Sequence, residues 1–324
     1  MADVTTTKTQ IPNEINNFYD RSLLVRAVAN FVHTRWAQVR DIPANNGTDT
    51  IKFRRYGNLT AATTALTEGV TPTGSQLSVT DITAQVLQYG DYVTITDIVS
   101  MTTLDPILTE TSEVLGDQAG DTLDQLTRDV MIAGTTVQYA STASARTDIT
   151  AAMKLTAAEV REAVRTLQTA KAKPVMRMID PNNAYNTVPL GKCYVGIVTP
   201  SSLFDLKSDS AFVPVQKYPS QANVMEDEVG AVDDVRFVLS QNGKVYTAGG
   251  SGGVDVHGTL IIGRDYYGIT RVAGKALENI IKPLGSGGTE DPLNQRATSG
   301  WKATFVAKRL NEAFAVRIEH GVTS

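Results

Sequence analysis

The longest regular pattern of apolar residues in this chain predicts one long amphipathic helix. Its stripe has spacings of three, four and seven residues, and consists of Leu108, Leu115, Ala119, Leu123, Leu126 and Val130. Asp105 and Pro106 supply an N-cap and a proline at the first helical position, and the pattern continues to about Gly134. Outside the stripe lie the acidic residues Glu110, Glu113, Asp117, Asp121 and Asp124. Such a helix is a rod of roughly 40 Å.

The segment before this helix has the alternation of a long β-hairpin. Ile51, Phe53 and Tyr56 lie among the basic residues Lys52, Arg54 and Arg55, and the pattern then gives way to a small, polar insert over 58–76. Strand character returns over 77–86 and changes parity afterwards, as a bulge near 88–90 would produce. Because a two-stranded ribbon is marginally stable alone, this hairpin predicts a partner surface on another chain.

The rest of the chain mixes helices and strands. Residues 1–20 are polar and favour an arm, followed by a short helix near 24–32. Thr156 and Glu159 form the capping box of a helix that stops before Pro174. Strands are expected at 192–198 and 235–239, a short helix at 201–207, and a terminal antiparallel hairpin from 304–309 and 313–318. Without regular β-α alternation, the fold class is α+β.

Composition and charge restrict the function classes. The chain has 324 residues, with 42% hydrophobic and 20% charged residues, which is typical of a folded globular protein. Its net charge of -4, with Lys and Arg dispersed, argues against a dedicated nucleic-acid reader. A mildly acidic surface still suits a wall that faces packed nucleic acid, because it does not adsorb a polyanion. No signal peptide or 18-residue apolar stretch is present, so no membrane contact is expected.

Catalytic and metal-binding patterns are weak. Cys193 is the single cysteine, and His33, His257 and His320 are isolated in sequence, so we expect no metal, no cofactor and structural or surface histidines that are dispensable for assembly. The acidic runs at 226–228 and 233–234 are interpreted as solvated faces, and the glycine-rich stretches at 249–253 and 285–288 as loops. A hydrolase would need a nucleophile and base that the sequence does not bring together.

Several motifs resemble one known family. They are IKFRRYGNL at 51–59, LTEGVTP at 66–72, QYGDYV at 88–93, LTRDV at 126–130, GTTVQYA at 134–140, IIKPLGSGGTEDPLNQR at 280–296 and GWKA at 300–303. With these motifs, nearly the whole chain resembles the major capsid proteins of tailed bacteriophages, in the family typified by the N4-like phages.

The resemblance implies a Hong Kong 97-type capsid fold and names its parts. The implied domains are an N-terminal arm at 1–47, an extended hairpin or E-loop at 48–97, a peripheral domain with a spine helix at 98–188, an axial domain at 189–278, and a C-terminal β-hairpin of the peripheral domain at 279–324. The implied intersubunit contact is the E-loop tip, which consists of Leu66, Thr67, Glu68, Gly69, Val70, Thr71 and Pro72. The strand charges Lys52, Arg54 and Arg55 are the second set of candidate site residues.

The implied function is structural and not enzymatic. Identical subunits would form hexamers and pentamers of an icosahedral phage head, assembled in the bacterial cytoplasm and present in the virion. The expected partners are a separate scaffolding protein, a portal, a decoration protein in some cases, and packaged double-stranded DNA through non-specific contact. A tube or decoration protein of the virion is the alternative, and a soluble hydrolase is a third class.

Overall fold

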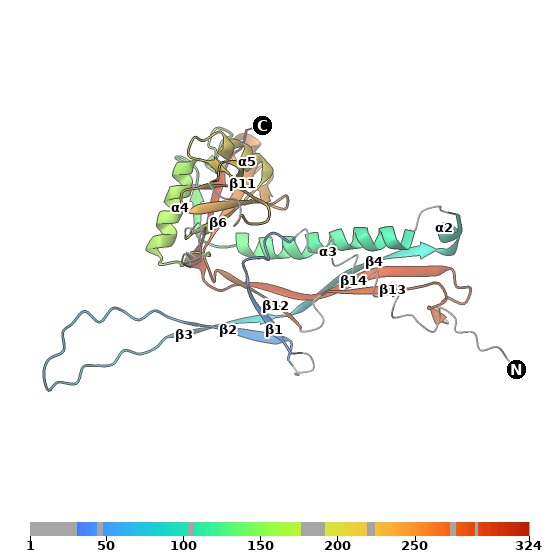
Figure 1. Ribbon diagram of the computed structural model, residues 1–324, viewed down its shortest axis with the longest axis horizontal. Coiled ribbons are helices and arrows are strands. Elements are labelled where there is room, and N and C mark those ends of the chain that lie inside the picture. Colours follow the sequence, from blue (N-terminus) through green and yellow to red (C-terminus); the bar gives the residue numbers. More distant parts are fainter. Residues whose placement is uncertain are drawn as a thin grey trace, which may run out of the picture.

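The chain forms an upper lobe, a long arm and a hairpin that projects away from both (Figure 1). This computed structural model describes residues 31–43, 48–102, 107–175, 192–218, 224–272, 277–288 and 291–323. Most of the predicted arm at 1–47, including residues 24–30 of the predicted helix, lies outside the described residues. The predicted N-cap at Asp105 and Pro106 does so as well.

The arm consists of a five-stranded sheet with a long helix lying along it (Figure 1). The strands are β1 (Gln38–Ile42), β12 (Tyr267–Val272), β14 (Arg296–Arg309), β13 (Leu277–Lys282) and β4 (Leu87–Thr96). The 14-residue strand β14 is the spine of this sheet, because it pairs with β4 and β13 along one part and with β12 along the other. A short helix, α2 (Asp97–Thr102), follows β4.

The long helix is α3, Ile107–Ile132, and its 26 residues confirm the predicted rod. Leu115, Ala119 and Leu123 of the predicted stripe are buried in the main hydrophobic core, together with Trp301 of β14. The indole N–H of Trp301 donates to Oε1 of Gln118 at 3.0 Å, which fixes the helix on the sheet. Asp124 differs from its predicted place outside the stripe, because it is fully buried.

The predicted bulge near 88–90 is wrong. β4 pairs with β14 in one unbroken register from Leu87↔Phe305 to Thr96↔Arg296. The change of parity comes instead at Val86, between β3 (Val79–Gln85), which pairs with β2 (Thr50–Tyr56), and β4, which joins the arm. Only β2 and β3 therefore form the two-stranded hairpin.

The upper lobe contains an eight-stranded sheet with both faces covered. In order of pairing its strands are β5 (Val137–Tyr139), β15 (Ala315–His320), β11 (Val256–Ile262), β6 (Tyr194–Val198), β9 (Val235–Leu239), β8 (Glu228–Val232) and β7 (Val213–Pro214), with β10 (Lys244–Tyr246) beside β11. Every residue of β6 is buried, because its alternate side chains enter two different core clusters. Short 3-10 helices connect these elements at Arg146–Asp148, Val215–Lys217, Ser251–Gly253 and Glu312–Phe314.

The predicted strands at 192–198 and 235–239 are confirmed, as are two helices. α4 (Ala157–Thr169) begins at the predicted cap, where Thr156 Oγ1 accepts from the amide of Glu159, and it ends before Pro174. α5 (Pro200–Lys207) has Thr199 as its N-cap. Val160 and Leu167 of α4 pack with Leu203 and Leu206 of α5 in the second core cluster, so these helices cover one face of the sheet.

The predicted terminal hairpin is wrong in its pairing. Both strands exist, but β14 lies in the arm sheet, whereas β15 pairs with β11 and β5 in the upper lobe. Between these two strands, at the 3-10 helix Glu312–Phe314, the chain passes from the arm sheet to the sheet of the upper lobe. A short connection makes two strands antiparallel neighbours only if both strands lie in the same sheet. Here β14 and β15 lie in different sheets, so they do not pair.

Candidate assembly surfaces

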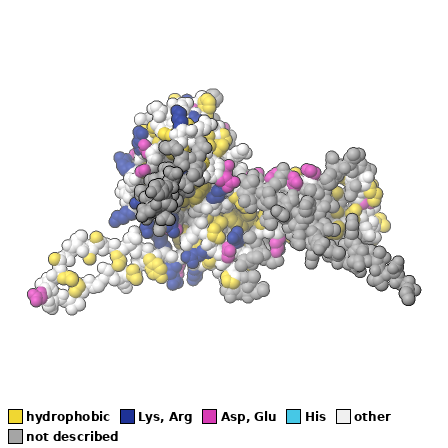
Figure 2. Space-filling model, viewed as in Figure 1, with side chains coloured by type: hydrophobic (Ala, Val, Ile, Leu, Met, Phe, Trp, Pro, Cys, Tyr) yellow, Lys and Arg dark blue, Asp and Glu magenta, His cyan; other side chains and the backbone are white. Residues whose placement is uncertain are grey.

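The hairpin presents the most exposed surface of the described chain. β2 and β3 pair antiparallel with Phe53 opposite Ile82, and every residue from 58 to 81, including the first three of β3, is exposed. At the tip, Leu66 keeps 77% and Val70 62% of their surface in contact with solvent. Figure 2 shows this projection as polar and apolar surface, with one acidic group at its far end. A segment with so little contact to its own chain is suited to contact another molecule.

A tight turn shapes the tip. The amide of Val70 donates to the carbonyl of Thr67 at 3.2 Å, and Gly69 has a φ of 77°. A positive φ at the third position of a four-residue turn is the conformation that favours glycine. The turn places Glu68 at the corner of the tip, where it is the single charged residue between positions 58 and 80.

A small apolar cluster fixes the base of the hairpin to the body. Phe53 of β2 and Ala84 of β3 are buried against Leu310, which follows β14, and Ile51, Ile82 and Val306 pack around them. This cluster is separate from the two large cores. The attachment of the hairpin therefore depends on few side chains.

The strand charges lie at the base, so the structure does not bring them together with the tip. Arg54 pairs across the strands with Asp81, at 3.0 Å between Nε and Oδ1, and this hydrogen bond lowers the pKa of Asp81. Nη1 of Arg55 lies 3.5 Å from the carbonyl oxygen of Leu310. Lys52 is exposed on the same strand.

A cavity at the hairpin base is the feature that the sequence did not indicate. Its volume is about 560 Å³. Five cationic residues from three separate segments line it: Arg40, Arg54, Arg55, Lys171 and Lys173. Among the described residues that line it, Asp265 is the single acid, and Phe53, Leu310 and Phe314 give it an apolar wall. In Figure 2, basic side chains gather in this region, where the hairpin meets the body.

A second exposed apolar surface lies at the opposite end of the arm. Tyr92 of β4, Ile98 and Met101 of α2, and Leu293 before β14 each expose about two thirds or more of their surface. Figure 1 places α2 at the far end of the arm from the hairpin tip. The molecule thus carries exposed apolar groups at both of its extremities.

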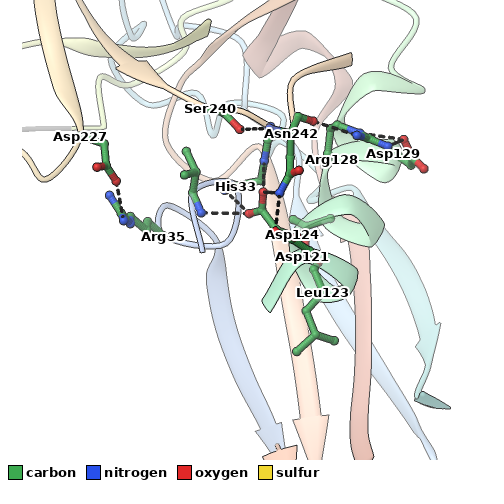
Figure 3. A network of polar contacts seen from close by, with 12 residues as sticks. His33, Arg35, Asp121, Leu123, Asp124, Arg128, Asp129, Asp227, Ser240 and Asn242 are labelled. Atoms are coloured by element: carbon green, nitrogen blue, oxygen red, sulfur yellow. Dashed lines mark hydrogen bonds and ion pairs between the residues drawn. The ribbon is translucent and has the colours of Figure 1, made fainter. Parts of the chain in front are cut away.

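A buried polar junction connects the segment before β1 to the helix α3 and to the upper lobe (Figure 3). Oδ1 of Asp124 accepts from the amides of Val32 and His33 at 2.9 and 2.7 Å, and Oδ2 lies 2.7 Å from Nδ1 of His33. The amide group of Asn242 donates to the same carboxylate at 3.4 Å, and the hydroxyl of Tyr267 donates to the carbonyl of His33. His33 is therefore a structural residue.

The other two histidines, His257 and His320, are also buried and hydrogen-bonded. Nδ1 of His257 lies 2.9 Å from Oγ1 of Thr199, which in turn lies 2.6 Å from Oγ of Ser202. These three side chains have the residue types of a hydrolytic arrangement, but Ser202 is fully buried and Thr199 is occupied as the cap of α5. Burial lowers the pKa of His257 and raises that of Cys193 to about 11, which keeps this thiol protonated at neutral pH.

The acidic residues and potential metal ligands in the described part of the chain form no metal site. No group of three or more histidine, cysteine, aspartate or glutamate side chains there is placed to hold a metal ion. The run at 226–228 is not wholly solvated as predicted, because Glu228 is buried and accepts from the Tyr218 hydroxyl at 2.8 Å. No helix among the described residues is long and apolar enough to cross a membrane.

Solved structures of phage capsids share this architecture. The capsid protein of Ralstonia phage GP4 has a TM-score of 0.73 at 12% identity, over 92% of this chain and 91% of that chain. The capsid protein of cyanophage Pam1 has a TM-score of 0.65 at 16% identity, over 99% of both chains. A protein in the head of Helicobacter pylori bacteriophage KHP40 has a TM-score of 0.61 at 12% identity, over 91% and 90%.

Comparison of sequences finds no match. No protein-family model matches the chain, and no curated protein matches it. The N4-like subfamily stays a prediction. In its three-dimensional structure, the chain has the mixed α+β fold of tailed-phage capsid proteins, the Hong Kong 97-type fold.

Proposed function

We propose that this chain is a major capsid protein that assembles as hexamers and pentamers into the icosahedral head of a tailed double-stranded DNA phage. The observation that supports this most strongly is the hairpin, in which residues 58–81 are exposed without exception on a chain with a capsid fold. A ribbon of this kind gains backbone and side-chain contacts when it lies on a neighbouring subunit. The role is structural rather than enzymatic.

The test is assembly of the purified chain with and without the tip. Intact chain is expected to elute as capsomers or shells, and negative-stain images distinguish shells from rings or tubes of another virion protein. Deletion of 66–76 is expected to abolish assembly while the far-UV circular dichroism and the unfolding midpoint stay unchanged. A control replaces 66–76 with a Gly-Ser linker of equal length. It keeps the length of the hairpin and removes the tip side chains, so it shows which of the two assembly requires. Normal shells from the deletion variant would refute the E-loop assignment.

The other partners and the domain boundaries are also proposals. A separate scaffolding protein is expected to be required for shells of uniform size; uniform closed shells from the chain expressed alone would contradict this. A portal, a decoration protein and non-specific contact with packaged DNA follow from the same function, as does assembly in the host cytoplasm. We retain the domain division at 47, 97, 188 and 278, with β5, α4 and β15 assigned to the axial domain, and β4 and β12 to the peripheral domain.

A further inference from the structure

We propose that the cavity at the hairpin base receives the hairpin tip of a second copy of this chain, with Glu68 entering among the five cationic residues. This inference rests on the proposed function and names the receiving site for its hairpin. The cavity and the tip are complementary in charge and in apolar content, as the following observations show.

The cavity is concave and strongly cationic. Arg40 comes from β1, Arg54 and Arg55 from β2, and Lys171 and Lys173 from the segment that follows α4. Arg54 has a carboxylate partner in Asp81. Among the described lining residues, Asp265 is the single acid beside these five cations, so positive charge is in excess. A carboxylate that enters this cavity is attracted by an excess of positive charge.

The tip has the matching chemistry. Glu68 is the one charge in a long uncharged stretch, and the turn at Gly69 sets it at the corner, between the exposed side chains of Leu66 and Val70. The apolar flanks match the wall formed by Phe53, Leu310 and Phe314. A phosphate of nucleic acid would satisfy the cations but would leave this wall without an apolar partner.

The tip lies away from the cavity of its own subunit. The hairpin extends away from the body, and the run from 57 to 67 spans roughly 35 Å when extended (Figure 1). Tip and cavity are different surfaces of one molecule, so their contact is heterologous. Repeated by rotation, a heterologous contact closes a ring in which each subunit gives one tip and receives one.

The first experiment is a charge swap. Glu68→Lys alone, and Lys171→Glu with Lys173→Glu alone, are expected to reduce the yield of shells at least tenfold. Combining all three substitutions is expected to raise the yield at least threefold above either reversed chain, because the introduced lysine then meets the two introduced carboxylates, although Arg40, Arg54 and Arg55 remain in the lining. The matched control is Lys207→Glu with Lys217→Glu, which changes the net charge equally at exposed sites away from the cavity and is expected to leave the yield unchanged.

The second experiment traps the contact covalently. Glu68→Cys and Lys171→Cys in one chain are expected to form intersubunit disulfides in oxidised shells, giving a ladder on a non-reducing gel that ends at the ring size. Each single variant is expected to run as a monomer, since Cys193 is buried. Closed shells that yield only monomers from the double-cysteine chain would overturn the proposal.

The outcomes separate this inference from the proposed function. If the original chain forms neither capsomers nor shells, the proposed function fails. If it forms shells but the combined charge swap does not rescue assembly, only the tip and cavity pairing fails. If the Lys171 and Lys173 reversal leaves assembly intact and reduces retained DNA, the cavity binds nucleic acid and the proposal is overturned.

Discussion

Asp124 is a buried carboxylate that joins three distant parts of the chain. Its four contacts join the residues before β1, the helix α3 and Asn242 of the upper lobe. A helix stripe shows which positions face a sheet, but it does not show that an acidic residue beside the stripe meets a histidine 91 positions away. The histidines could therefore be predicted as structural, whereas their contacts could not.

His33→Ala is expected to destabilise the fold, which revises the expectation that all three histidines are dispensable. The change leaves Asp124 buried without its closest side-chain partner, and breaking a buried pair in this way costs about 3 kcal/mol. Urea unfolding of the tip-deleted chain, which is expected to stay unassembled, measures the difference. Gln125→Ala on the exposed face of α3 is the control. A loss below about 0.5 kcal/mol would show that the junction is not stabilising.

His320 is expected to make stability depend on pH. Nδ1 lies 2.9 Å from the carbonyl of Gly321, so it carries the proton, and Nε2 accepts from the Thr259 hydroxyl at 3.0 Å. Complete burial is the main cause that lowers the pKa of His320 to about 4, and the nearby His257 contributes in the same direction. The unfolded chain therefore binds more protons than the folded chain between about pH 4 and 6.5.

The sign of this effect follows from the lowered pKa. The contribution of neutral His320 is fully present above pH 6.5 and is lost as the pH falls toward 4, on the order of 3 kcal/mol. Unfolding free energies of the tip-deleted chain at several pH values from 7.5 to 4 measure it. His320→Gln keeps hydrogen-bonding atoms without titrating, so a smaller slope is expected. Equal slopes in both proteins would assign the pH dependence to other groups.

Helices were predicted more completely than strand partners, for a physical reason. The stripe of α3 and the cap and stripe of α4 are local, so the sequence shows which face each helix buries and where α4 begins. Strand alternation shows faces but not partners, and the partners of β14 and β15 lie in different sheets. The switch of partner at Val86 was likewise visible only as a change of parity.

Phe53→Ala is expected to free the hairpin without unfolding the body. The side chain is 5% exposed in a small cluster with Ala84 and Leu310, so its removal eliminates most of the apolar contact at the base. A Phe→Ala change in a core costs about 3 kcal/mol or more. Hydrogen exchange of the unassembled chain should become faster in β2 and β3 and stay unchanged in α4 and β6. The control is Tyr56→Ala on the same strand, where the ring is 59% exposed.

If exchange in the hairpin is already complete in the original chain, Phe53 does not hold it in place. If exchange also rises in β6, the hairpin and the body unfold together. Either outcome would contradict attachment through this cluster alone.

The two ends of the hairpin are different surfaces, because the tip lies at one end and the cationic cavity at the other (Figure 1). The tip could be predicted from one continuous sequence motif. The cavity could not, since its cations come from β1, β2 and the segment after α4 and meet only in the folded chain. A subunit with both surfaces extends a ring, whereas a subunit that lacks one of them interrupts it.

A tip-deleted subunit should therefore inhibit assembly of the intact chain rather than remain inert. It keeps the cavity and accepts a neighbour's tip, but it offers no tip to the next subunit. If every junction of a hexamer is needed, a mole fraction of one tenth leaves about half of the rings intact, compared with about nine tenths for an inert additive. Sedimentation of mixtures refolded together measures the yield of shells. Adding Lys171→Glu and Lys173→Glu to the tip-deleted chain removes its receiving site as well, and this control should lose the inhibition; equal inhibition by both chains would mean that the inhibition does not act through the cavity.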